Sequence, residues 1–414
     1  MFRTSLIKTI KRNIPATGGR QRVAYFTGTS TCTSTSNVLL AVEKDNIRST
    51  QVIETILQPL QQNEVRLKIE KFALTSNTVT YGKVGEKIGY FDFYPTKHES
   101  LRCVPAIGWA EVVESNVPGV PVGGRHFGWY PMSKYVTVEA TPSKNGFKDI
   151  GIHRKSSAEV YTEHIRTDLD SFRDMTLADK NEDDYDDRQA LLRGLFLTSF
   201  LADEFLADKS NYFDAKTIVL VSASSKTALG IAQRLSNKNE ALELSQRLNI
   251  VGVTSAGNSS FVSSTGFYDQ IVTYDAIEES ISRDYDAVVI DMSGNWKVLS
   301  EIHQHLGERV KHSMAIGLSH HDSGFAPKSL VMPGAAPTFF FAPAEVARRL
   351  KMWGPKEFHI RSKAALTTFI TGSQEWMDVN HVHGVADVHR EWLNAHDGKI
   401  PPTIGMIASM HDVE

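Results

Sequence analysis

The chain has 414 residues, enough for two or three domains with sizeable cores. Hydrophobic residues make up 41% and charged residues 22%, as in an ordinary globular protein, and the formal net charge of -3 gives no general attraction to nucleic acid or anionic lipid. The two cysteines, Cys32 and Cys103, are too few for a disulfide framework or a four-cysteine zinc site, and no apolar run has the length of a membrane span.

The first 40 residues differ from the rest in charge, because no acidic residue precedes Glu43. Serine and threonine also crowd residues 27–36. A start that is basic, poor in acids and rich in hydroxyls is typical of a mitochondrial transit peptide, and this predicts a mitochondrial location. The alternative is a disordered basic tail on a cytoplasmic protein. In either case we expect residues 1–40 to lie outside the fold. The basic residues are Arg3, Lys8, Lys11, Arg12, Arg20 and Arg22.

Residues 41–165 are predicted to form a β-rich domain. Apolar and polar residues alternate over 65–69, as in a half-buried strand. Further strands are expected at 109–114 and 126–130, and the stretch rich in proline and glycine between them predicts a turn. This pattern indicates a compact barrel of short strands.

Residues 166–188 contain a run of acidic side chains, among them Asp183, Asp184, Asp186 and Asp187. A charge run of this kind is typical of a solvated loop. We therefore expect an acidic linker loop, without chemistry of its own, between the first domain and the next.

Strand and helix patterns alternate over residues 189–342, which predicts a doubly wound parallel sheet of the Rossmann type. After it, residues 343–414 are expected to form a C-terminal segment with two helices and a short final strand. The strands of the parallel sheet are expected at 218–221, 249–254, 286–291 and 314–317. Helices are expected at 190–206, between the first three strands, at 296–306, and in the C-terminal segment near 344–352 and 386–395, with the final strand at 404–407.

The turn after the first of these strands resembles a dinucleotide-binding turn that has lost its glycines, since only Gly230 remains. Such a turn directs backbone N–H groups and the positive end of a helix at a pyrophosphate. Here Lys226 would offer a positive charge and its neighbours hydroxyl groups. The alternative is a degenerate Rossmann domain that binds nothing, in which Lys226 caps a neighbouring strand or pairs with Asp291. The hydroxyl-bearing candidates for cofactor binding are Ser222, Ser224, Ser225 and Thr227.

The end of the second strand favours NADPH over NADH. NAD enzymes place an acidic residue there to bond the ribose hydroxyls, whereas this strand ends in Thr254 and Ser255, followed by Asn258. Small hydroxyl and amide groups could accept a 2′-phosphate, although no Arg or Lys stands there to neutralise it. We therefore predict that these three residues bind the cofactor.

Several segments resemble the medium-chain dehydrogenase/reductase superfamily. The stretch PAIGWAEVV at 105–113 is similar to that family's segment ending in G-x-x-x-G-x-V, and VGGRH at 122–126 stands where the family usually has G-D-R-V. AVVIDMSG at 287–294 is similar to its fourth strand and D-x-x-G, which adds Asp291 to the cofactor-binding candidates. Residues 388–406 resemble its terminal helix and strand. The resemblance implies a GroES-like substrate domain completed by the C-terminal segment, a Rossmann cofactor domain, and a homodimer.

The match is closer to one uncharacterised branch, catalogued as a domain of unknown function. Members of this branch carry SASSKTA in place of the glycine turn, as at residues 222–228. The stretches at 77–81, 252–258 and 319–321 look like the same branch. No reaction is assigned to it, so this resemblance specifies fold and lineage only.

Catalytic zinc is not expected, because Cys103 lacks the histidine and acidic residue that zinc-dependent members place a few residues on. The HxH at His381 and His383 has too few further ligands nearby and is interpreted as non-metal. The chain therefore resembles the zinc-free quinone and enoyl reductases, in which a hydride passes from the nicotinamide to a conjugated substrate.

Three residues are candidates for catalysis. Tyr81 and Asn77 stand where zinc-free reductases often place a tyrosine or asparagine over the substrate, and the tyrosine could donate a proton. The alternative for Tyr81 is a packed aromatic on the barrel wall. His320 follows the last predicted strand of the parallel sheet and could donate a proton or orient a carbonyl. The alternative for His320 and its neighbour His321 is polar surface.

Together these patterns predict an NADPH-dependent reductase of a small enone, quinone or enoyl-type substrate, acting without zinc. The alternative is a catalytically inactive Rossmann scaffold that binds a partner or an acyl ligand. The missing glycines favour the scaffold, and the retained polar turn favours the enzyme.

Overall fold

The alternating stretch at 65–69 forms part of a strand in the wall of a closed barrel. The computed structural model describes residues 36–316 and 332–413. Val65, Leu67 and Ile69 are at most 1% exposed, since they point into the barrel core. This strand, β3, pairs with both β5 and β7, and that double pairing closes six strands into a ring. Around the ring the strands are β3 (Glu64–Ala73), β5 (Pro105–Ser115), β6 (Arg125–Pro131), β9 (Glu163–Arg166), β8 (Gly146–Asp149) and β7 (Tyr135–Ser143).

A small antiparallel sheet lies against the barrel, and its first strand corrects the predicted start of the fold. It consists of β2 (Asn46–Ile56), β1 (Ser36–Glu43) and β4 (Leu101–Arg102). Leu40 and Val42 are fully buried in the barrel core. The expectation that residues 36–40 belong to a leader or tail is therefore wrong. Residues 1–35, which carry the proposed transit peptide, lie outside the described residues.

The predicted Rossmann sheet is present as six parallel strands. The predicted β-strand at 249–254 is confirmed, and the boundaries of the three others shift. The strand expected at 218–221 begins at 217, that expected at 286–291 begins at 287, and that expected at 314–317 spans 310–315. The short edge strands were not predicted. In spatial order the strands are β12 (Gln270–Thr273), β11 (Asn249–Thr254), β10 (Thr217–Val221), β13 (Ala287–Asp291), β14 (Val310–Ala315) and β15 (Pro337–Phe339).

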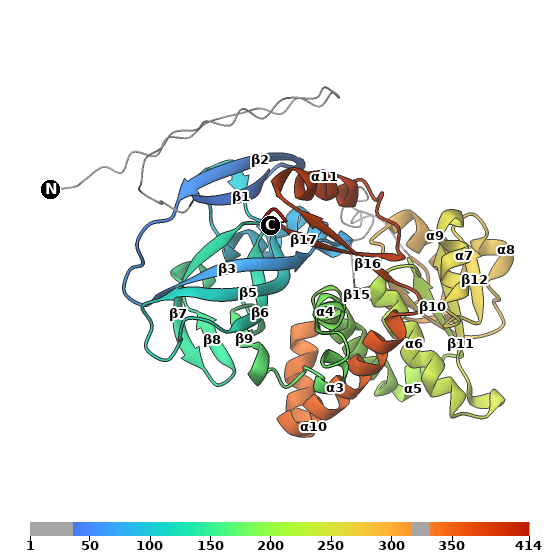
Figure 1. The fold of residues 1–414 in the computed structure, drawn as a ribbon. Coiled ribbons are helices and arrows are strands. Elements are labelled where there is room, and N and C mark those ends of the chain that lie inside the picture. The colour runs from blue at the N-terminus through green and yellow to red at the C-terminus, as the bar shows by residue number, and fades with distance from the viewer. Residues whose placement is uncertain (1–35, 317–331, 414) are drawn as a thin grey trace.

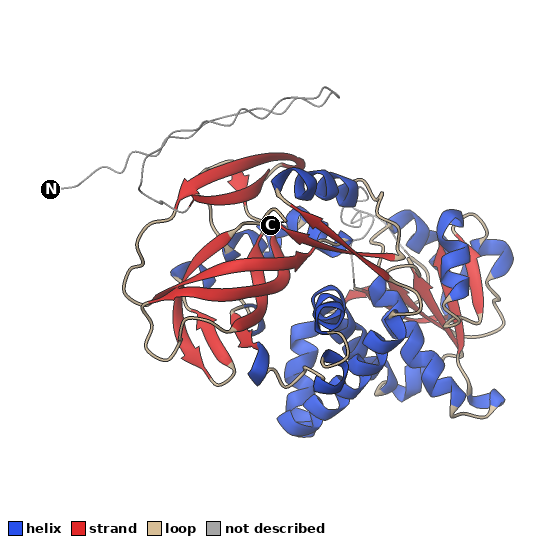
Figure 2. Cartoon of the chain, in the orientation of Figure 1, coloured by secondary structure: helices blue, strands red, loops and turns tan. Residues whose placement is uncertain are grey.

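Helices cover both faces of this sheet, which makes it doubly wound (Figure 2). Alternate residues of β10 point to opposite sides, so that Ile218 packs with α4 and α6 on one face and Val219 packs with α8 and α9 on the other. The continuous apolar run of β10 is thus explained by burial on two sides. These helices and their neighbours are α4 (Glu182–Ala207), α5 (Ser210–Phe213), α6 (Lys226–Glu240), α7 (Ala256–Ser264), α8 (Ile277–Ser280) and α9 (Trp296–Leu306).

The C-terminal segment first packs beside the parallel sheet and then returns to the barrel. Its long helix α10 (Ala342–Ser373) lies along α4, where the rings of Phe196 and Phe369 stack with centroids 4.7 Å apart. Only from β16 (Asp378–His383) onward does the chain join the barrel sheet, followed by α11 (Val385–His396) and β17 (Ile404–Ser409). Figure 1 shows β16 and β17 running between the barrel and the parallel sheet with its helices. The expected completion of the β-rich domain by the C-terminal segment is confirmed.

The acidic run is not a solvated loop, and this expectation is wrong. Asn181 caps α4, and residues 182–187 form the first turns of that helix. Asp186 is 0% exposed and lies between the guanidinium groups of Arg125 and Arg173. Asp187, 1% exposed, bonds Lys71 Nζ at 2.7 Å. These carboxylates join the barrel to α4. The preceding short helices are α1 (Ser76–Lys83), α2 (Gly85–Ile88) and α3 (Met175–Ala178).

None of the helices that the structure describes has the length and apolarity needed to cross a bilayer.

Candidate functional site

The turn between β10 and α6 lies at the carboxyl edge of the parallel sheet, where doubly wound folds bind ligands. Ser222 opens the turn with a positive φ of 63°, a conformation that favours glycine. Ser225 then caps α6, its Oγ accepting a hydrogen bond from the Ala228 backbone N at 3.2 Å. The turn thus combines a positive φ at its first residue with a serine cap at the start of α6.

The one glycine that remains, Gly230, has a packing role. A Cβ on Gly230 would come within 2.6 Å of Ser199 Oγ and 3.1 Å of the Phe196 ring on α4. Ser199 Oγ in turn donates to the Thr227 carbonyl at 2.8 Å. Gly230 therefore allows α6 and α4 to approach closely, whereas the third glycine of a dinucleotide fingerprint allows its helix to approach a strand.

Lys226 is partly buried and contacts the last strand and the turn before it. Its Nζ donates to the backbone carbonyls of Ile404 at 3.2 Å and Pro402 at 3.4 Å, at the start of β17. Burial lowers the pKa of Lys226 to about 8. Among residues 36–316 and 332–413, no carboxylate lies within ion-pair distance of this ammonium. The contact matches the predicted alternative in which Lys226 caps a neighbouring strand, and it leaves a partly buried positive charge without a counter-ion from the described residues.

The second predicted cofactor segment lies next to the turn. Asn258 Nδ2 donates to Ser224 Oγ at 3.1 Å. This bond joins the start of α7, which follows β11, to the turn that follows β10. Ser255 precedes α7 without a side-chain bond to that helix, and Thr254 is 1% exposed. Burial raises the pKa of Tyr274 to about 12, while a hydrogen bond with Ser222 opposes the rise. The two predicted segments therefore form one polar edge.

Asp291 does not take part in this polar edge through its carboxylate. Its Oδ1 accepts from the Ser293 N at 2.7 Å and the Ser293 Oγ at 2.6 Å, and its Oδ2 accepts from the Gly294 N at 3.1 Å. Burial raises the pKa of this carboxyl group. Asp291 therefore shapes the loop after β13, which is a structural reason for the D-x-x-G pattern.

Asn77 and Tyr81, one helical turn apart on α1, are hydrogen-bonded to each other. Asn77 Nδ2 donates to Tyr81 Oη, which leaves the hydroxyl proton of Tyr81 available for another acceptor. The Tyr81 ring packs against Tyr90 and Trp129, with centroid distances of 4.7 Å and 5.0 Å. Burial raises the pKa of Tyr81, so that the hydroxyl stays protonated at neutral pH. Both predicted interpretations, packed aromatic and proton donor, fit this geometry.

Strand β17 links the two sets of candidates. The Leu74 backbone N donates to the Met406 carbonyl at 2.9 Å, and α1 begins at Ser76. Ile404, two residues before Met406, receives the bond from Lys226. The turn and the Asn77–Tyr81 pair are therefore joined through a few residues of β17. His320 and His321 lie outside the described residues, so the structure places neither.

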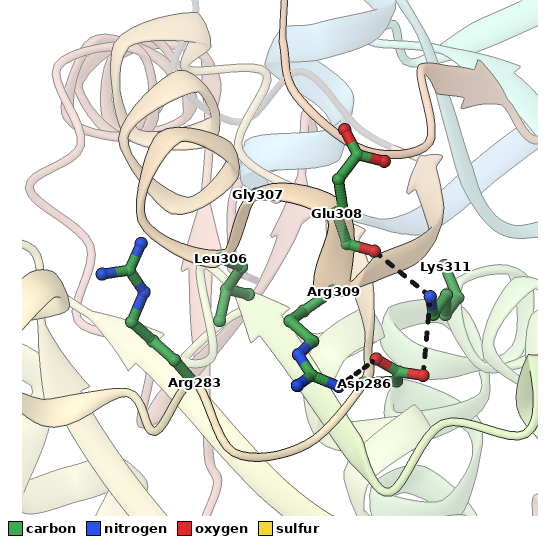
Figure 3. Close-up of a pocket in the computed structure, with 7 residues that line it drawn as sticks. All are labelled: Arg283, Asp286, Leu306, Gly307, Glu308, Arg309 and Lys311. Atoms are coloured by element: carbon green, nitrogen blue, oxygen red, sulfur yellow. Dashed lines mark hydrogen bonds and ion pairs between the residues drawn. The ribbon is translucent and has the colours of Figure 1, made fainter.

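Two surface hollows lie away from this polar edge. One, of about 530 Å³, is at the amino ends of β13 and β14, where Asp286 pairs with Arg309 at 3.2 Å and Lys311 at 3.5 Å (Figure 3). The other, of about 810 Å³, lies between the barrel and α3, beside Arg125 and Arg173. Ligands of doubly wound sheets bind at the carboxyl ends of the strands, so we assign neither hollow to the cofactor.

Metal ligands do not converge in the part of the chain that the structure describes, where no three His, Cys, Asp or Glu side chains are grouped to hold an ion. Burial raises the pKa of Cys103 to about 12, which disfavours the thiolate that a metal requires. Sequence reasoning missed the partner of His381, whose Nε2 bonds Asp187 at 2.6 Å. Asp187 and His381 are 194 residues apart in the chain, and no local pattern pairs them.

Comparison with solved structures identifies the fold. CurA from Vibrio vulnificus in complex with NADPH has a TM-score of 0.53 at 12% identity, covering 91% of this chain and 100% of that one. A proposed NADPH:quinone reductase from Bacillus thuringiensis has a TM-score of 0.50 at 14% identity, covering 91% of this chain and 99% of that one. At such identities the likeness concerns the fold, and it agrees with the resemblance to the medium-chain superfamily.

Sequence comparison gives the family. No curated protein matches the sequence. One family profile matches residues 72–401, and it is described as a protein of unknown function, DUF2855. Because this match covers most of the chain, including five of the six barrel strands, the parallel sheet and α11, the protein belongs to the DUF2855 family.

Proposed function

We propose that this protein is an NADPH-dependent reductase of a small enone, quinone or enoyl-type molecule. The observation that carries the proposal is the partly buried Lys226 ammonium at the start of α6, which has no carboxylate partner among residues 36–316 and 332–413. A buried charge without a counter-ion is costly, and a pyrophosphate at this helix terminus would supply one. The hydroxyls of Ser224 and Ser225 and the amide of Asn258 lie along the same edge and suit phosphate and ribose oxygens.

The proposed chemistry divides between cofactor and protein. Bound NADPH would supply a hydride to the conjugated substrate. Tyr81 would hold a proton at Oη for the oxygen or carbon that becomes basic, and Asn77, donating to the same oxygen, would fix the direction of that proton. The raised pKa keeps Tyr81 in its protonated form, as a proton donor requires. Solvent would then replace the proton that the tyrosine gives up.

We further propose that the reaction proceeds without zinc. The donor set supports this part of the proposal, because Cys103 is buried with a raised pKa and the described residues offer no cluster of three ligands. Polarisation of a substrate carbonyl would then come from the Tyr81 hydroxyl.

A substitution at Ser225 tests cofactor binding. Aspartate is a good helix cap, so Ser225→Asp should fold normally while placing a negative charge where the pyrophosphate would sit. We expect the NADPH dissociation constant, measured by nicotinamide fluorescence, to rise about 100-fold. Ser225→Asn is the matched control, since it caps the helix without charge and should stay within about threefold of the parent chain.

The outcome of the same titration also decides between the two predicted functions. If Ser225→Asp and Ser225→Asn bind NADPH with the same dissociation constant, the nucleotide binds away from the start of α6. If the parent chain binds neither NADPH nor NADH at millimolar concentration, the reductase is excluded and the inactive scaffold becomes the better interpretation.

Removal of the Tyr81 hydroxyl tests the proton donor. With NADPH and either a 1,4-benzoquinone or a 2-alkenal as probes, Tyr81→Phe should lower kcat/KM about 100-fold and leave NADPH affinity unchanged. Tyr90→Phe is the control, since it removes a hydroxyl from the adjacent ring, whose Oη lies 3.5 Å from Tyr161 Oη. Equal activity of the two variants would mean that Tyr81 is only a packed aromatic.

A further inference from the structure

Lys226 belongs to the nucleotide turn by sequence, yet its acceptors among the described residues lie at the C-terminal strand, one in β17 and one in the turn directly before it. Its Nζ bonds the carbonyls of Pro402 and Ile404, which are 176 and 178 residues away in the chain. An ammonium group has three N–H donors, and these two carbonyls use two of them. Among the residues that the structure describes, the remaining donor and the charge have no further partner, so an anion at the start of α6 could take them.

The strand that Lys226 contacts also sets the position of α1. β17 pairs with β3 in the register Ile407 to Ala73, and the Leu74 N–H bonds the Met406 carbonyl at 2.9 Å. The chain then turns into α1, where Thr75 and Thr78 form a reciprocal capping box. Because the helix is fixed by its cap directly after β3, a shift of β17 at residues 404–406 would move Asn77 and Tyr81.

We propose that Lys226 is a positioning residue that couples cofactor occupancy to the substrate side of the protein. A phosphate of the bound dinucleotide and the carbonyls of Pro402 and Ile404 share the partly buried ammonium, so that binding of the cofactor holds the start of β17 and, through Leu74, α1 in a single arrangement. This inference rests on the proposed function, because it requires a dinucleotide at the turn.

A purely structural clamp predicts different behaviour. In that case Lys226 would hold β17 equally with and without a ligand, and its charge would be unnecessary. The charge is the distinguishing property, since partial burial of an ammonium with no carboxylate among the described residues carries a free-energy cost that two neutral carbonyls only partly offset. A clamp alone could use a neutral donor.

The experiment is hydrogen exchange of the full-length protein with and without saturating NADPH. The parent chain should show slower exchange with NADPH at the Leu74 amide and in residues 404–409. Lys226→Met removes both charge and donors, and Lys226→Gln keeps a donor without the charge. Both variants should bind NADPH at least about tenfold more weakly, and at saturation both should lack the added protection at Leu74.

NADPH affinity measured as a function of pH gives a second test, because a purely structural role of Lys226 would not make that affinity depend on its charge. The ionisable side chains of the described residues do not contribute to the lowered pKa of Lys226, which comes from burial. NADPH affinity of the parent chain should therefore weaken from pH 7 to pH 9 as the ammonium loses its proton, and that of Lys226→Gln should stay constant. Thermal midpoints of both variants in the absence of NADPH verify that they fold.

The outcomes separate the coupling from the function. If the parent chain binds no dinucleotide, the proposed function fails and the coupling is overturned with it. If the parent chain binds NADPH but either variant keeps the parent's protection at Leu74 and its pH profile, the coupling alone is overturned. If Lys226→Met and Lys226→Gln both lose the added protection at Leu74 and the pH dependence of NADPH affinity, the coupling is supported.

Discussion

Replacement of Asp186 by asparagine should lower the free energy of unfolding by about 3–5 kcal/mol, the cost of breaking a buried ion pair from one side. The Asp186 carboxylate is 0% exposed and lies between Arg125 of β6 and Arg173, which precedes α3. Arg173 is itself 4% exposed at its side chain. Loss of the carboxylate charge would leave these guanidinium groups with Glu70 and Glu182, the latter 65% exposed.

Thermal unfolding measures this effect, and the same helix provides its control. For a chain of this size that unfolds as a unit, the expected loss corresponds to a decrease of about 5 °C in Tm. Asp183→Asn removes a carboxylate three residues earlier, where the side chain is 89% exposed, and should cost less than about 1 kcal/mol. If both variants unfold within 1 °C of each other, the Asp186 ion pairs contribute little to stability.

The same carboxylate explains why sequence analysis misjudged the acidic run. A row of acids resembles a solvated loop as long as the partners are unknown. The partners of Asp186 come from 13 and 61 residues away, and the backbone carbonyl of this residue also accepts the Trp109 indole N–H at 3.0 Å. Tertiary pairing of this kind has no local signature. The sequence does offer one hint that residues 182–189 (EDDYDDRQ) are helical, because Asn181 directly before them is a good helix cap.

The parts of the fold with strong periodicity were predictable. The apolar run of β10 and the spacing of α6 and α9 depend on neighbours close in sequence, and these elements lie where the pattern indicated. Strand β12 was missed because it has only four residues. For Lys226, the residue type indicated that it would seek acceptors, but sequence alone could not specify that these are the carbonyls of β17.

Two histidines inside the barrel should make the stability of this protein depend on pH. His126 is 3% exposed and His164 is 1% exposed, and both rings pack against Phe147, with centroid distances of 5.1 Å and 4.6 Å. Burial lowers the pKa of His126 to about 4 and that of His164 well below its usual value of 6.5. Both rings are therefore neutral in the folded protein at physiological pH.

The sign of the effect follows from proton binding in the two states. Below pH 6.5 the unfolded chain protonates these histidines while the folded chain does not, so the folded state loses stability as pH falls. Well above pH 6.5 these histidines are neutral in both the folded and the unfolded chain, so this loss of stability is absent. For His126 the loss is about 2 kcal/mol between pH 7.5 and pH 5 and about 3 kcal/mol by pH 4, at 1.36 kcal/mol per pKa unit.

Urea unfolding at pH 7.5 and pH 5.0, compared between the parent chain and His126→Gln, isolates this contribution from that of the carboxyl groups. Glutamine can still donate to the Gly124 carbonyl, which the His126 ring bonds at 3.0 Å, but it cannot take up a proton. The decrease in unfolding free energy from pH 7.5 to pH 5.0 should therefore be about 2 kcal/mol smaller in the variant. His164→Gln should change the pH dependence in the same direction, because His164 is also neutral through burial. An unchanged pH dependence in both variants would mean that these rings are hydrated or already protonated in the folded barrel, contrary to their packing against Phe147.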